Sequence, residues 1–101
     1  MFFGEHVRLG FNDRDELYCI AMSGGYRGLY LAKFGIGSPM KDLNELHSLE
    51  FDDGDEMNYP EGQLACGISF GGSSVSLETD PAQMISCMTV HDWSRKSVTP
   101  V

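Results

Sequence analysis

The chain has 101 residues, of which 42 % are hydrophobic and 11 % aromatic, and its formal net charge is −8. This length and apolar content are typical of one folded domain with its own core, and we expect residues 1–101 to form a single domain. The negative charge argues against direct binding of nucleic acid, because contacts to phosphate depend on Lys and Arg.

Three strands are predicted in the first third of the chain. Residues 6–11 (HVRLGF) alternate apolar and polar side chains, as half-buried strands do, and the turn-forming sequence NDRDE follows them. Residues 17–22 (LYCIAM) supply the return strand. After the glycine-rich residues 23–28, residues 29–34 (LYLAKF) indicate a third strand, so that the three form an antiparallel meander.

A helix is predicted to follow, with Ser38 as its N-cap and Pro39 at its first position. Its apolar stripe, with one residue at every third position, consists of Met40, Leu43, Leu46 and Leu49. Residues 52–62 contain two glycines, a proline and mostly acidic side chains, and they are predicted to form a loop.

The second half of the chain predicts one more hairpin and one more helix. Residues 64–70 and 75–77 are the candidate strands, joined by a Gly-Gly-Ser-Ser turn. Thr79-Asp80-Pro81 then opens a helix that carries Met84, Ile85 and Met88. The predicted fold is therefore α+β: an antiparallel sheet of about five strands with two helices on one face, in the order βββ-α-ββ-α.

The charge is divided unevenly along the chain. Residues 42–94 contain eleven of the fifteen acidic residues and none of the seven Lys and Arg residues. Like charges without compensation repel one another and destabilise the compact state. A basic partner would make use of such a field, although acidic loops that only keep a protein soluble are the alternative.

Metal and cofactor sites are not expected from the motifs. In an EF-hand loop counted from Asp53, the fifth position would be Met57 and the sixth Asn58, so the calcium template fails. The three histidines belong to no HxxxH, HExxH or CxxC motif that would organise zinc, and the glycine-rich segments lack the phosphate-loop sequence. Adventitious binding of a divalent cation by the carboxylates of residues 52–56 stays open.

A small thiol enzyme is one functional hypothesis. Cys87, His91 and Asp92 supply the residue types of a nucleophile, a base and an orienting group, and a helix would place Cys87 and His91 on one face. The acidic surroundings disfavour this chemistry, because a reactive thiolate needs an electropositive setting.

The cysteines and the first residues bear on the compartment. Cys19, Cys66 and Cys87 are odd in number and widely spaced, which predicts reduced thiols. No apolar run approaches the about 20 residues of a membrane helix, and the sequence MFFGEHVRLG carries charge where a signal peptide would be apolar. We therefore expect a cytoplasmic protein that does not contact membranes.

The leading hypothesis is a non-enzymatic inhibitor that binds a basic protein, such as an immunity protein against a nuclease toxin or a similar antagonist of a nucleic-acid enzyme. Enzymes that hold phosphates present cationic surfaces, and an acidic domain is captured quickly by such a surface. The predicted partner-binding residues are Glu50, Asp52, Asp53, Asp55, Glu56, Tyr59 and Glu61.

Two alternatives concern how the chain meets its partner. Tyr59 would be an aromatic anchor in the interface, or its ring would instead pack onto its own domain. The chain as a whole would be an accessory subunit of a larger complex if Phe2, Phe3 and Trp93 formed an obligate interface.

Overall fold

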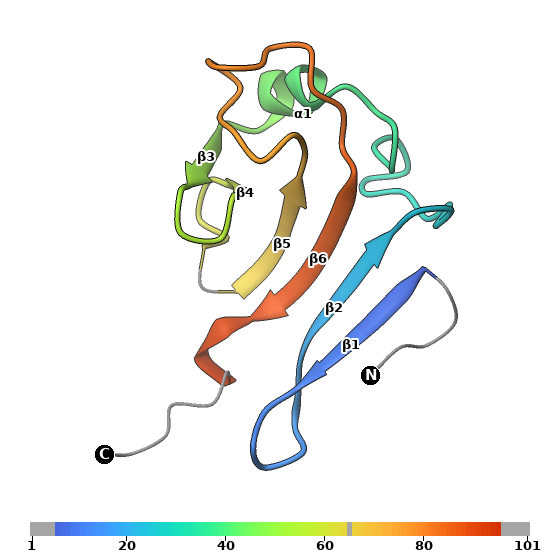
Figure 1. Ribbon diagram of the computed structural model, residues 1–101, viewed down its shortest axis with the longest axis vertical. Helices are drawn as coiled ribbons and strands as arrows, with labels where there is room; N and C mark the ends of the chain where they lie inside the picture. The colour runs from blue at the N-terminus through green and yellow to red at the C-terminus, as the bar shows by residue number, and fades with distance from the viewer. Residues whose placement is uncertain (1–5, 65, 96–101) are drawn as a thin grey trace.

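One antiparallel sheet of six strands organises the chain in the computed structural model, which describes residues 6–64 and 66–95. The strands lie in the order β1-β2-β6-β5-β4-β3 (Figure 1). The elements are β1 (Val7–Phe11), β2 (Leu17–Ser23), α1 (Met40–Leu46), β3 (Leu49–Asp52), β4 (Met57–Pro60), β5 (Cys66–Gly71), β6 (Cys87–Asp92) and the 3-10 turn η1 (Trp93–Arg95). The predicted α+β class with an antiparallel sheet is confirmed, whereas the predicted five strands and two helices are wrong in number.

The hairpin of β1 and β2 matches the sequence prediction. Its register pairs Val7 with Met22. Asn12 holds the turn, because its side-chain oxygen accepts the N–H groups of Arg14 and Glu16, each at 2.9 Å. An asparagine that bonds to the main chain a few residues ahead is a common way to close a turn. The alternation of apolar and polar residues and the turn-forming sequence both indicate this hairpin, which is why it could be predicted.

Residues 29–34 form a turn instead of the predicted third strand. Leu31 and Ala32 both have positive φ angles, 54° and 57°. The carbonyl oxygen of Tyr30 accepts the N–H of Phe34 at 3.0 Å. Two successive left-handed residues reverse the chain direction, so a strand cannot continue through them. The reversal brings Phe34 into the core and leaves Leu31 exposed.

Helix α1 lies at one end of the sheet (Figure 1), at the predicted place in the chain, but it is shorter than predicted and lacks the predicted cap. Pro39, not Ser38, occupies the N-cap position, and it makes no side-chain cap hydrogen bond. The Ser38 hydroxyl instead accepts the N–H of Gly35 at 3.0 Å. Within the described part of the chain, no helix is long and apolar enough to cross a membrane.

β3 and β4 form a hairpin where a loop was predicted over residues 52–62. The register pairs Glu50 with Tyr59 and Asp52 with Met57. The loop prediction is wrong because it depended on polarity. The strand that this prediction missed, β4, lies between β3 and β5, and three of its four residues are buried, so pairing on both sides decided its conformation. The edge strand β3 can carry acidic side chains because an edge strand is only partly buried.

The predicted second helix, over residues 79–93, is absent from the described structure. Its C-terminal half is instead strand β6, which lies between β2 and β5 in the middle of the sheet. Thr89 and Val90 are β-branched residues, which favour a strand, and Met88 is buried opposite both Met22 and Phe70. The spacing of the methionines fitted a helix, but pairing on both sides of the segment decided its conformation.

The connection from β5 to β6 replaces the predicted strand at residues 75–77. Buried Gln83 organises this connection, because its side-chain nitrogen donates to the carbonyl oxygens of Val75 at 2.9 Å and Asp80 at 3.1 Å. Its side-chain oxygen accepts the N–H of Ser73 at 3.2 Å. The hydrogen bonds of this one side chain therefore hold the connection in place, where the prediction expected the main-chain hydrogen bonds of a strand.

The core lies between α1, the loops beside it and one face of the sheet. Its buried apolar side chains come from helix, loops and strands alike: Met22, Phe34, Met40, Leu43, Phe70, Ile85 and Met88. Full burial of a side chain of this size contributes about 1.5–3 kcal/mol. The β3–β4 hairpin extends from this core at the edge of the sheet, which is where the candidate site lies.

Candidate functional site

The β3–β4 hairpin gathers most of the predicted partner-binding residues in one place. We call residues 49–60 the acidic hairpin. Glu50 and Asp52 lie on β3, and Asp53, Asp55 and Glu56 belong to the turn that joins β3 to β4. Glu61 follows directly after β4 and is exposed. The six carboxylates, which are neighbours in sequence, thus surround one short hairpin.

Two of these acids build the turn. The carboxylate of Asp52 accepts the N–H of Gly54 at 2.7 Å, and the carboxylate of Asp55 accepts the N–H of Met57 at 3.0 Å. The N–H of Glu56 donates to the main-chain oxygen of Asp52 at 2.8 Å, with Glu56 in a left-handed conformation at φ 59°. Hydrogen bonds of this kind fix the hairpin turn, so the carboxylates of Asp52 and Asp55 are held in place and Asp53 and Glu56 are carried on a fixed main chain.

The remaining hairpin acids have no cation beside them. Among residues 6–64 and 66–95, the ion pairs are those of Arg95 with Glu16 and with Asp92, each at 3.3 Å. Glu50, Asp53 and Glu56 are exposed and have neither an ion pair nor a side-chain hydrogen bond within the same residues. The negative charge of the acidic hairpin is therefore uncompensated by any described Lys or Arg.

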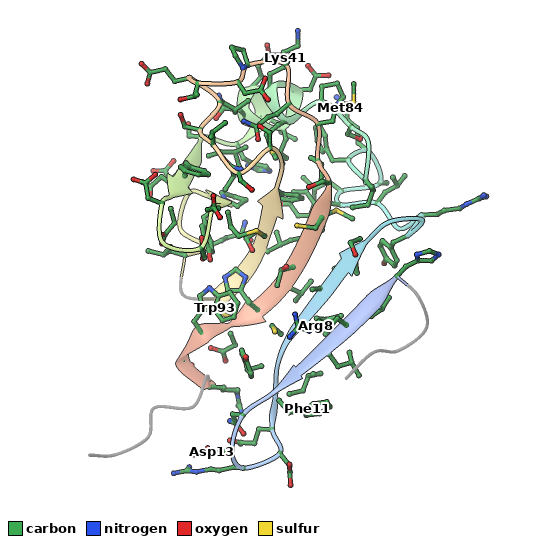
Figure 2. All side chains as sticks on the ribbon, in the orientation of Figure 1. Arg8, Phe11, Asp13, Lys41, Met84 and Trp93 are labelled. Atoms are coloured by element: carbon green, nitrogen blue, oxygen red, sulfur yellow. The ribbon has the colours of Figure 1, made fainter. Side chains whose placement is uncertain are left out.

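Two of the early basic residues, Arg8 and Arg14, lie away from the acidic hairpin. Arg8 lies on β1, which is the opposite edge strand of the sheet from β3. Arg14 lies in the β1–β2 turn, which is well separated from the β3–β4 turn (Figure 1). Lys41 lies on α1, which directly precedes β3 in the chain, and it is at the opposite end of the molecule from Asp13 in the β1–β2 turn (Figure 2); among the described residues it forms no ion pair with a hairpin acid.

A cleft of about 350 Å³ opens beside the acidic hairpin. Its lining combines carboxylates with apolar and aromatic groups: Glu50, Phe51, Asp52, Asp53, Gly54, Tyr59 and Leu64. A concave surface with three carboxylates along its wall has the charge and polarity to accept a cationic side chain with an aliphatic stem.

Tyr59 packs onto its own domain, which is the second of the two arrangements considered from the sequence. Only 1 % of Tyr59 is exposed, so its side chain is not accessible to a partner as an interface anchor. Its hydroxyl donates to the carboxylate of Asp55 and accepts the indole N–H of Trp93 at 3.1 Å. Burial, together with the Asp55 hydrogen bond, raises the pKa of Tyr59 to about 12. The residue supports the acidic hairpin from inside.

Two supporting residues from β6 and η1 were not recognised from the sequence as part of this site. The ring of His91 stacks on Trp93 with centroids 4.6 Å apart and meets the edge of Tyr59 at 5.3 Å. The Nε2 atom of buried His91 lies 3.0 Å from the carbonyl oxygen of Gln63 and 3.2 Å from that of Leu64. A buried Trp N–H usually has a hydrogen-bond partner, but no sequence pattern indicates that the partner of Trp93 is a tyrosine 34 residues away.

The arrangement that motivated the thiol-enzyme hypothesis is not present. Cys87 and His91 lie four residues apart on a strand, which separates their Cα atoms by about 13 Å, whereas a helix would have made them neighbours. Burial raises the pKa of the Cys87 thiol, and its sulfur fills the space over Gly71. The third residue, Asp92, is bound to the hydroxyl of Ser94 and to Arg95, and both lower its pKa.

Metal ligands and the predicted apolar interface were also considered. In the part of the chain that the structure describes, no three His, Cys, Asp or Glu side chains converge as metal ligands would. Phe2 and Phe3 lie outside the described residues. Trp93, the third member of that predicted interface, is part of the support of the acidic hairpin.

Comparison with known proteins gives no relative: no protein-family model, no curated protein and no solved structure matches this chain significantly.

Proposed function

We propose that this chain is a non-enzymatic inhibitor that binds a basic protein through the acidic hairpin. The partner class is a nuclease toxin, for which the chain would be the immunity protein, or another enzyme that acts on nucleic acids. The observation that supports the proposal is the gathering of Glu50, Asp53 and Glu56 on one fixed hairpin with no described cation beside them.

Electrostatics explains why such a surface suits capture of an enzyme. A nuclease must hold phosphates, so the surface around its active site is cationic, and a carboxylate-rich hairpin can take the place of the substrate there. Complementary fields raise association rates to as much as about 10⁸–10⁹ M⁻¹ s⁻¹. An inhibitor that protects a cell from a toxin gains most from a fast association.

The fixed conformation of the hairpin adds to this. Main-chain N–H groups bind Asp52 and Asp55, and the buried Tyr59 ring lies beneath them. A surface that is already ordered loses less conformational entropy on binding. We assign direct contacts to Glu50, Asp53, Glu56 and Glu61. Asp52 and Asp55 shape the turn, and Asp52 also keeps its second carboxylate oxygen for the partner.

The test is an inhibition and binding experiment with a panel of purified basic nuclease domains. At low ionic strength, the account predicts inhibition of at least one nuclease, with an association rate constant that falls steeply as salt is raised from 50 to 500 mM, because salt screens the exposed carboxylates. Association that does not respond to salt, or a panel in which no nuclease is inhibited, would contradict the proposal.

A second candidate function, an interaction domain of a larger complex, is favoured by a different surface. Leu29 and Leu31 are 58 % and 57 % exposed, and with Val90, which is 46 % exposed, they line an apolar cavity of about 210 Å³. Exposed apolar surface of this kind often marks an interface. Binding that persists at high salt and is abolished by Leu31→Lys would support this candidate over the inhibitor.

A further inference from the structure

The outer strand of the acidic hairpin has main-chain groups that the fold does not use. β3 pairs only with β4 in the described sheet. The N–H of Glu61 donates to the carbonyl oxygen of Ser48 at 3.0 Å, which fixes the alternation of the ladder. Because bonded pairs alternate in an antiparallel ladder, Glu50 and Asp52 bond inward to β4, and Leu49 and Phe51 direct their N–H and C=O groups outward.

Phe51 is the position where this outer edge is open. The N–H of Leu49 is already bound by the side-chain oxygen of Asn44 at 3.0 Å. In residues 6–64 and 66–95, no hydrogen-bond partner is found for the outward N–H and C=O of Phe51. An edge strand with such groups can accept a further strand from another chain.

The charges on β3 determine which strand fits. If a second copy of this chain paired antiparallel around Phe51, Glu50 of one copy would lie opposite Asp52 of the other, twice in each ladder. Like charges directly opposite one another destabilise a strand pair. Pairing of this edge with a second copy of the chain is therefore unfavourable. A strand with cationic residues opposite Glu50 and Asp52 would instead gain two favourable cross-strand pairs.

We propose that the basic partner adds an extended segment to the outer edge of β3, a step that rests on the basic-partner function proposed above. One partner residue exchanges both main-chain hydrogen bonds with Phe51. The residues before and after it then lie opposite Glu50 and Asp52, on the face of the sheet where the 350 Å³ cleft opens. The recognised sequence is therefore a cationic residue, any residue able to form a strand, and a second cationic residue.

The test uses two short peptides and the intact chain. The first peptide, threonine-lysine-valine-lysine-threonine with blocked ends, has the predicted pattern. The second has proline in place of the valine, so it keeps the charge but cannot donate the central N–H. We expect the valine peptide to bind about tenfold more tightly than the proline peptide in an NMR titration, because main-chain hydrogen bonds are lost in the latter.

Matched variants of the protein test the hydrogen bond that the Phe51 N–H donates to the peptide. Phe51→Pro removes the outward N–H and leaves every carboxylate in place, whereas Phe51→Val keeps the N–H. The valine peptide should bind Phe51→Val as it binds the original chain and should bind Phe51→Pro about tenfold more weakly. If Phe51→Pro does not fold, slower exchange of the Phe51 amide hydrogen in the original chain when the valine peptide is bound provides the same information.

The outcomes separate this inference from the inhibitor function. Equal binding of the valine and proline peptides, without protection of the Phe51 amide, would overturn strand addition while leaving charge-driven capture intact. Salt-dependent inhibition of a nuclease together with no peptide binding would also overturn strand addition alone. Peptide binding that requires the Phe51 N–H, in a chain that inhibits no nuclease, would support the edge as a binding site and contradict the inhibitor function.

Discussion

The β1–β2 turn and the β3–β4 turn contain three acidic residues each, Asp13, Asp15 and Glu16 in the first and Asp53, Asp55 and Glu56 in the second, but these acids have different surroundings. In the β1–β2 turn, Arg95 forms an ion pair with Glu16, and the side chain of Asn12 donates to the same glutamate at 3.0 Å and to the Arg95 carbonyl oxygen at 2.6 Å. In the β3–β4 turn, Asp53 and Glu56 have no described cation within reach. The difference is one of compensation in space, which Glu16 has and Asp53 and Glu56 lack, and it is the reason for choosing the β3–β4 turn as the candidate binding surface.

The two hairpins also differ in what holds them to the domain. The β1–β2 turn is fixed by hydrogen bonds of the half-buried Asn12. The β3–β4 hairpin is fixed by the buried ring of Tyr59, which lies against His91 and accepts a hydrogen bond from Trp93. An exposed cluster of like charges repels itself, so a large buried aromatic group beneath it supplies the stability that the surface loses.

The largest effect is expected from removing Tyr59, the support of the β3–β4 hairpin, in comparison with Asn12, the support of the β1–β2 turn. Tyr59→Ala should lower the free energy of unfolding by about 3–5 kcal/mol, because it leaves a cavity in place of a fully buried ring. Asn12→Ala should lower it by about 1–2 kcal/mol, through lost hydrogen bonds in a partly exposed turn. Denaturant unfolding of both variants measures the difference. Equal losses would show that the two hairpins are held with similar strength.

A smaller effect concerns the hydroxyl group of Tyr59. Its pKa is about 12 in the folded chain, against 10.0 for an ordinary tyrosine, so the unfolded chain releases this proton first as the pH rises. The free energy of unfolding should therefore fall between pH 10 and pH 12 through this group, and the contribution should be complete below pH 10.

Tyr59→Phe isolates that contribution from other groups that titrate at high pH. The variant should be less stable at neutral pH, because Asp55 and Trp93 each lose a hydrogen-bond partner, and its stability should decline less steeply from pH 10 to pH 12. Thermal unfolding at several pH values measures both slopes. Identical slopes for the variant and the original chain would mean that Tyr59 ionises equally in the folded and unfolded states.

Local sequence patterns predicted the parts of the fold that depend on local interactions. The β1–β2 hairpin follows from alternation and from a turn closed by Asn12, and α1 begins within two residues of the predicted Ser38-Pro39 start. The six carboxylates could be named as a candidate surface because they lie within twelve positions of the sequence, residues 50–61, so any compact turn would gather them.

The parts that depend on distant partners could not be predicted. The segment that leads into β6 carries Met84, Ile85 and Met88 at helical spacing, and only the pairing of β6 with β2 and β5 makes the end of this segment a strand. This error concealed the support of the acidic hairpin, because His91 and Trp93 reach Tyr59 only when β6 crosses the middle of the sheet. The same error made Cys87 and His91 seem to be neighbours.

Matched charge reversals on the two turns test the central claim most directly, with a nuclease that the chain inhibits as the partner. One variant carries Asp53→Lys and Glu56→Lys, and the other carries Asp13→Lys and Asp15→Lys, so both change the net charge equally. At 50 mM salt, the first should associate with the nuclease at least about tenfold more slowly than the second, and the gap should close as salt is raised. Equal association rates for the two variants would contradict the account, because the acidic hairpin would then be no more than one part of a general negative charge.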